Sequence, residues 1–208
     1  MRARTVCLVL AAVFAATPAV AEEPPAHVHG EALEGDTPLA ERSVYQLSGA
    51  FTDAHGRPFR LSELRGKPVL ALLFYGTCQS ACPILVRDLQ RIDASFSPVE
   101  QSGVRFLLVT FDPAVDTPER LAAYAKEHGL GTTRWTLLNG TPDQVRELAA
   151  VLGVRYRATG DGQYSHTQRI VLLDREGVVV EKFDGLDRPL EPIVARTRKE
   201  IVPGAARP

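Results

Sequence analysis

Cys78 and Cys82 are the candidate reactive residues of this 208-residue chain. Three residues separate them, and the proline that follows Cys82 is typical of the first turn of a helix. Because a helix start carries unpaired N–H groups and partial positive charge, it favours thiolate over thiol. The pair is therefore suited to a redox couple, to two ligands of one metal ion, or to one structural disulfide.

A distant histidine, His166, can join the cysteines at one edge of a sheet. The apolar run 69–75 predicts a buried strand that ends just before Cys78. His166 lies in a predicted loop directly before another expected strand, 169–174. If the second strand runs antiparallel to the first, its start lies at the edge where the first one ends, and the three side chains can converge.

Two thiolates and one imidazole are donors that copper(I), copper(II) and zinc all accept, although a structural zinc usually takes a fourth ligand. The other histidines offer no clear fourth ligand. His128 is expected to cap the C-terminus of a helix, and His55 lies at a predicted turn tip. His27 and His29 lie in a segment rich in proline, glycine and acidic residues, which we interpret as a solvated tether. The residues alone leave metal binding and thiol chemistry open.

The remaining elements predict an α/β fold in which helices flank a mixed sheet. Residues 44–59 predict an N-terminal β-hairpin. Further strands are expected at 104–111, 134–138, 169–174 and 178–183, with helices after Cys82 and at 117–129, 141–153 and 190–201. Asp112 follows the strand 104–111, so we expect it at the same edge of the sheet as the cysteines.

The amino terminus predicts export. Residues 1–21 have two early arginines, an apolar stretch and a small-residue cleavage pattern, which indicates a signal peptide; the alternative is a membrane anchor that is not cleaved. Cleavage would remove Cys7 and Met1. Residues 22–42 then form a flexible tether and 43–203 the folded domain, in the periplasm or another exported location. The formal net charge of −1 gives no reason to expect nucleic acid as a partner.

Three segments, taken in order, resemble the Sco/SenC family: FYGTCQSACP (74–83), TFDPAVDTPE (110–119) and YSHTQRIVLLDREG (164–177). Members of that family are thioredoxin-like exported proteins that bind copper and help deliver it to the binuclear copper centre of cytochrome c oxidase. The resemblance implies a thioredoxin-like, copper-binding domain. It also implies that the copper ligands are Cys78, Cys82 and His166.

The resemblance has two departures and one further match. Asp112 and Pro113 match the family's Asp-Pro pair, so Asp112 is expected to support the ligands. Gln79 stands where the family commonly has proline, and Ser165 stands where it commonly has aspartate. Neither residue is a ligand, but both can change the pKa and redox potential of the thiols and the orientation of His166.

The leading prediction is an exported copper chaperone that passes copper to a cuproenzyme such as a cytochrome oxidase subunit. The alternative is a thiol-disulfide oxidoreductase acting on cysteines of a periplasmic target. In that alternative Cys78 attacks as the thiolate, Cys82 resolves the mixed disulfide, and His166 is not needed. A peroxidase is disfavoured, because the Thr-Pro surroundings usual for a peroxidatic cysteine are absent.

Overall fold

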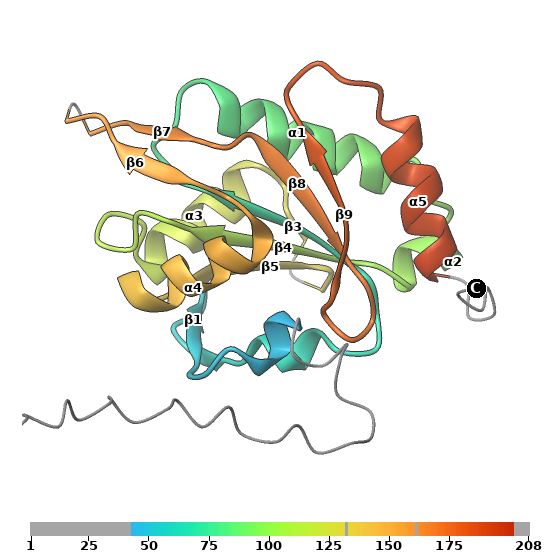
Figure 1. Ribbon diagram of the computed structural model, residues 1–208, viewed down its shortest axis with the longest axis horizontal. Coiled ribbons are helices and arrows are strands. Elements are labelled where there is room, and N and C mark those ends of the chain that lie inside the picture. Colours follow the sequence, from blue (N-terminus) through green and yellow to red (C-terminus); the bar gives the residue numbers. More distant parts are fainter. Residues whose placement is uncertain (1–42, 132, 161, 202–208) are drawn as a thin grey trace, which may run out of the picture. The chain divides into compact units, whose positions relative to one another are not determined.

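The computed structural model describes residues 43–131, 133–160 and 162–201. The predicted signal peptide (1–21) and tether (22–42) lie outside the described residues. Within them, a seven-stranded mixed sheet is flanked by helices, and a separate two-stranded sheet stands beside it (Figure 1). None of the helices in the described part of the chain combines the length and apolar character needed to cross a membrane.

The seven-stranded sheet has the order β2-β1-β5-β4-β3-β8-β9. Its strands are β1 Phe51–Asp53, β2 Pro58–Phe59, β3 Val69–Phe74, β4 Arg105–Thr110, β5 Trp135–Asn139, β8 Arg169–Leu173 and β9 Val179–Asp184. Strands β3, β4 and β5 are parallel, whereas β8 is antiparallel to β3. The predicted α/β fold with a thioredoxin-like mixed sheet is therefore confirmed, as is the N-terminal hairpin, in which β1 and β2 pair antiparallel.

The central strand β3 is apolar along its whole length because both of its faces are covered. Each of its six residues is at most 1% exposed. The helices of the fold are α1 Ala81–Ala94, α2 Pro98–Ser102, α3 Pro118–Glu127, α4 Pro142–Leu152 and α5 Glu191–Ile201, and two short 3-10 helices lie at Val44–Gln46 and Leu61–Leu64. The core lies between these helices and the sheet.

The predicted helix starts are confirmed by their caps. The Thr117 side chain accepts a hydrogen bond from the backbone N–H of Arg120, and Thr141 does the same for Gln144. A proline follows each threonine in the first helical turn, where its missing N–H costs nothing. Helix α4 ends at Gly153, whose φ of +69° is the left-handed conformation that glycine adopts without strain.

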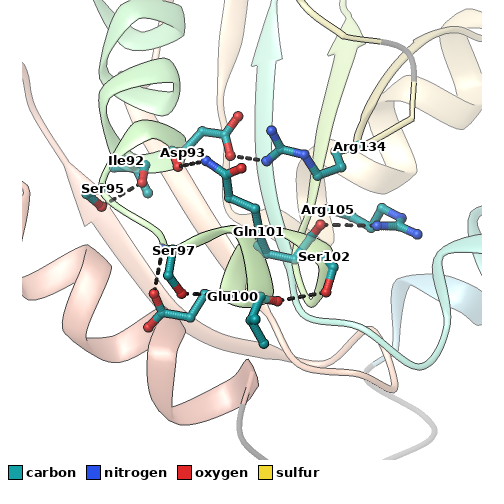
Figure 2. Close-up of polar contacts among 11 residues, drawn as sticks. Ile92, Asp93, Ser95, Ser97, Glu100, Gln101, Ser102, Arg105 and Arg134 are labelled. Carbon is teal, nitrogen blue, oxygen red and sulfur yellow. Dashed lines mark hydrogen bonds and ion pairs between the residues drawn. The ribbon is translucent and has the colours of Figure 1, made fainter.

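A polar network fixes the end of α1 that lies far from the cysteines. The Arg134 side chain contacts the Asp93 carboxylate, and Gln101 donates a hydrogen bond of 3.0 Å to the Asp93 carbonyl (Figure 2). Arg198 of α5 donates to Glu100 at 2.7 Å. Because the 14-residue helix α1 rises about 1.5 Å per residue, this anchor lies roughly 20 Å from the helix start.

Two strands were not predicted. Tyr156–Ala158 (β6) and Tyr164–His166 (β7) form an antiparallel hairpin that is separate from the seven-stranded sheet. The prediction that His166 lies in a loop is therefore wrong, because His166 is the last residue of β7. Gly160 and Gly162, with φ of +92° and +76°, allow the chain to turn between the two strands.

Candidate metal centre

Cys78, Cys82 and His166 lie together, as the antiparallel arrangement of β3 and β8 allows. One ligand atom from each residue can be chosen so that all three lie within 4.8 Å of one another. Cys82 Sγ and His166 Nε2 are 3.6 Å apart. Cys78 is 7% exposed, Cys82 is 1% exposed, His166 is half-buried, and both cysteines are free thiols. The predicted convergence is confirmed, while the role of the three residues as ligands stays a prediction.

The start of helix α1 positions the two sulfur atoms. Cys78 lies in the turn after β3, and its N–H donates to the Tyr75 carbonyl at 3.3 Å. Ser80 occupies the N-cap position but makes no side-chain capping bond. Instead, the backbone N–H of Cys82 donates to Cys78 Sγ over 3.4 Å. The Cys78 sulfur therefore satisfies one of the donors that every helix start leaves unpaired.

The surroundings separate the acidities of the two thiols. Burial raises the pKa of Cys78, but hydrogen bonds from the backbone N–H groups of Cys82 and Ser80 outweigh burial, so the net pKa lies below its ordinary value. Burial raises the pKa of Cys82 well above its ordinary value, and the charges of Cys78 and Asp116 add to that effect. Cys78 is therefore the thiol that ionises first.

His166 is held as a neutral imidazole that faces the sulfur atoms. Burial lowers the pKa of His166, and this effect is larger than the opposite effect of its hydrogen bond with the Thr167 carbonyl. Nδ1 lies 3.1 Å from that carbonyl oxygen, so we assign the proton to Nδ1. Nε2, which lies next to Cys82 Sγ, then has a free lone pair. A carbonyl that fixes the tautomer in this way is a common support for a metal-binding histidine.

Aromatic side chains attach the hairpin of His166 to the main fold. Tyr156 stacks on Phe111 with ring centroids 4.8 Å apart, and Tyr164 lies edge-on against Tyr75 at 5.1 Å. The centroid of the His166 ring lies 5.3 Å from that of the Phe111 ring. These contacts place His166 beside the cysteines although its hairpin does not pair with the main sheet.

Tyr75 connects the hairpin to the cysteine turn. Its hydroxyl donates to Gln163 Oε1 at 2.9 Å and accepts from the Tyr164 N–H at 3.4 Å. The same hydroxyl is one of the groups that lower the pKa of Cys78. Sequence reasoning placed Tyr75 at the end of a strand and gave it no role at the site.

Sequence reasoning also missed Asp116, which is 2% exposed. Its Oδ2 accepts hydrogen bonds from the Gly76 N–H at 2.9 Å and from the Thr110 hydroxyl at 2.5 Å. The side chain of Asn139 donates to the Asp116 carbonyl at 2.7 Å. Asp116 therefore ties the turn that leads to Cys78 to the ends of β4 and β5.

The predicted supporting residue, Asp112, lies in the same loop as Asp116 but has different contacts. Its backbone N–H donates to the Thr110 hydroxyl at 3.0 Å. Burial raises the pKa of Tyr164, and the charge of Asp112 and a hydrogen bond to its carboxylate raise it further. These contacts connect Asp112 to the hairpin of His166, and its role in supporting the ligands stays a prediction.

Among the described residues, the other two histidines do not join the site, and the two departures from the family pattern provide no ligand. His55 is exposed in the turn between β1 and β2. His128 is the C-cap residue of α3, as predicted, and its ring centroid lies 4.1 Å from that of Tyr124. Gln79 and Ser165 are exposed. His27, His29, Cys7 and Met1 lie outside the described residues.

A family model and a known relative each match most of this chain. The family model described as SCO1/SenC matches residues 40–202. A Stutzerimonas stutzeri protein named as copper-binding is 26% identical over 168 residues, covering 76% of this chain and 80% of its own length.

Two solved structures share the fold. Bradyrhizobium japonicum ScoI with copper bound is 26% identical, with a TM-score of 0.58, and the match covers 73% of this chain and 96% of that one. A SCO1/SenC family lipoprotein from Bacillus anthracis is 25% identical, with a TM-score of 0.68 and coverage of 76% and 96%. The family match spans well over half of the chain, and this protein belongs to the SCO1/SenC family.

Proposed function

We propose that this protein is an exported copper chaperone. Cys78, Cys82 and His166 hold one copper ion, which the protein then passes to a cuproenzyme. The observation that carries the proposal is the set of three donor atoms within 4.8 Å of one another. Family membership and the copper-bound relative from Bradyrhizobium japonicum support the choice of copper.

The donor set suits copper in either oxidation state. Two thiolates and one neutral imidazole give copper(I) three soft or borderline ligands, and copper(II) also accepts this combination. Binding requires both thiols to lose their protons, and burial raises the pKa of Cys82, so loading at neutral pH releases protons. His166 is half-buried and ends a hairpin outside the main sheet, which leaves copper open to ligand exchange with another protein.

Titration of the reduced protein with copper(I), against a chelator of known affinity, tests copper binding. We expect one copper per chain, loss of binding in Cys78→Ser, and binding weakened by more than about tenfold in His166→Ala, since loss of a group that only orients a ligand already costs roughly 10- to 100-fold. His55→Ala is the matched control, because His55 is an exposed histidine outside the site, and its affinity should equal that of the wild type. Wild-type affinity in both site variants would rule out the proposed site.

The acceptor that we propose is the binuclear copper centre of cytochrome c oxidase, as the Sco/SenC resemblance implies. The test mixes the copper-loaded protein with the soluble copper-binding domain of the oxidase from the same organism. We expect the absorption of the binuclear centre to appear in the acceptor. A domain that stays unloaded, although it accepts free copper, would point to another cuproenzyme.

A second candidate is thiol-disulfide exchange with a periplasmic target. The observation in its favour is the contrast between the lowered pKa of Cys78 and the raised pKa of Cys82, because an attacking thiol benefits from ionising first. The two candidate functions differ in their need for His166, which copper binding requires and disulfide exchange does not. His166→Ala should keep disulfide reduction of a model peptide while copper affinity falls, and equal loss of both activities would contradict a separate redox role.

A further inference from the structure

The β6–β7 hairpin has two chemically different faces. Successive residues of a strand point to opposite faces, and Tyr156 pairs directly with His166 across the hairpin. Tyr156, Tyr164 and His166 therefore share the inner face, where they contact Phe111. The outer face carries the residues between and beside them, which are Arg155, Arg157, Ser165 and Thr167.

The outer face has two arginines and no carboxylate among its described residues. Arg157 lies opposite Ser165 in the register, and the Thr167 N–H donates to the Arg155 carbonyl at 2.8 Å. Each arginine thus faces a neutral hydroxyl residue. Both arginines are exposed, and within the described residues neither side chain makes an ion pair. Among the described residues, therefore, no carboxylate neutralises either charge.

These outward side chains surround a shallow hollow that reaches His166. Its volume is about 360 Å³, and its lining includes Arg155, Arg157, Ser165 and His166. Alternate residues of a strand are about 6.6 Å apart, so the two guanidinium groups can flank a single carboxylate. An acidic group seated there would lie in a hollow that His166 also lines.

We propose that this outer face docks a carboxylate-bearing surface of the protein that exchanges copper with this chain. The proposal rests on the proposed copper function and names the chemistry of the partner's surface. Because the chain has a formal net charge of only −1, the cationic face is a local feature and not a reflection of a basic protein. Local charge of this kind speeds and orients encounters between proteins.

A protein surface fits this face better than nucleic acid does. Binding to DNA relies on many phosphate contacts by lysine and arginine, whereas this face offers two arginines. Two arginines with neighbouring hydroxyl groups match one or two carboxylates, which arginine binds in a bidentate manner.

The direct test uses hexaglutamate as the probe and follows backbone amide signals of the reduced, metal-free protein by NMR. We expect shifts at 155–157 and 165–167, and their loss in the double variant Arg155→Glu/Arg157→Glu. The double variant Arg60→Glu/Lys199→Glu changes the net charge equally and should keep the shifts. Lys199 belongs to α5, which lies on the opposite side of the described unit from β6 and β7 (Figure 1).

A finer variant tests the cross-strand geometry. Ser165→Asp places a carboxylate directly opposite Arg157, where it can neutralise that arginine within the hairpin, so hexaglutamate affinity should fall several-fold. Ser165→Asn, which is similar in shape but uncharged, should keep the affinity. The docking surface would be overturned by shifts outside the hairpin or by an equal loss of shifts in the control variant. Tighter binding of inorganic phosphate or of a DNA duplex than of hexaglutamate at the same residues would overturn it too.

Copper experiments separate this proposal from the function on which it rests. Arg155→Glu/Arg157→Glu should bind one copper with wild-type affinity, yet transfer it to the oxidase domain about tenfold more slowly at low salt. Equal transfer rates at low salt would overturn the docking surface and leave the chaperone function intact. A wild-type protein that binds no copper would overturn the function, while the hexaglutamate shifts would still decide whether the face binds carboxylates.

Discussion

Replacement of Asp116 by alanine should loosen the turn that leads to Cys78. The buried carboxylate accepts hydrogen bonds from the Gly76 N–H and the Thr110 hydroxyl, at 2.9 and 2.5 Å. A hydrogen bond to a charged group contributes roughly 1.5–3 kcal/mol, and removal of a buried charge offsets part of the loss. We therefore expect Asp116→Ala to lower the free energy of unfolding by about 2 to 4 kcal/mol.

Urea unfolding of the reduced, metal-free protein measures this change through the transition midpoint. Asp116→Asn keeps an oxygen that can accept from Gly76, so it should lose about half as much stability. Asp143→Ala is the matched control, because the Asp143 side chain is 81% exposed and makes only a surface ion pair, and it should change stability by less than about 0.5 kcal/mol.

The loss of Asp116 should also affect copper binding, because Asp116 supports the turn that leads to Cys78 although it is not itself a ligand. We expect Asp116→Ala to weaken copper binding by roughly tenfold, a size typical of groups that orient metal ligands. A free energy of unfolding for Asp116→Ala within about 0.5 kcal/mol of the wild-type value, which is on the order of measurement error, would contradict this role of Asp116. An equal loss of stability in Asp143→Ala would contradict it too.

Three further predictions concern thiol reactivity, acid stability and a helix end. Limiting iodoacetamide should label Cys78 before Cys82, because the pKa of Cys78 is lowered whereas that of Cys82 is raised. Peptide mass spectrometry measures the labelling of each cysteine, and equal labelling would contradict the prediction. Burial raises the pKa of Asp53, but hydrogen bonds from Arg57 lower it overall below 3.8, so this carboxylate stabilises the fold above about pH 4 and loses that effect as pH falls further. The stability deficit of Asp53→Asn in urea unfolding should therefore shrink below pH 4, roughly the unfolded pKa, and a constant deficit would contradict it. Gly153→Ala should cost about 1 kcal/mol in thermal or urea unfolding, because Gly153 has φ of +69°, and an unchanged midpoint would contradict the strain.

The sequence predicted the main sheet well because its strands carry strong signals. The run Val69–Phe74 is apolar along its length, and the threonine-proline pairs at Thr117 and Thr141 mark helix starts by local chemistry alone. The five main strands end within one residue of their predicted bounds. The convergence of Cys78 with His166 followed from this sheet once its last strands were taken as antiparallel.

The supporting parts of the site could not be predicted for physical reasons. Strands β6 and β7 have three residues each, too short for a pattern of alternation to stand out, and long-range aromatic contacts such as that of Tyr156 with Phe111 hold them in place. Asp112 and Asp116 lie in one loop, and only the folded backbone decides that Asp116 reaches Gly76. Contacts of this kind depend on tertiary structure, which local sequence does not reveal.

X-ray absorption spectroscopy of the copper-loaded protein counts the atoms bound to copper and so tests the proposed ligand set. We expect two sulfur neighbours and one nitrogen neighbour in the wild type, and loss of the nitrogen alone in His166→Ala. Copper bound only by nitrogen and oxygen, as the pair His27 and His29 would provide, would contradict it.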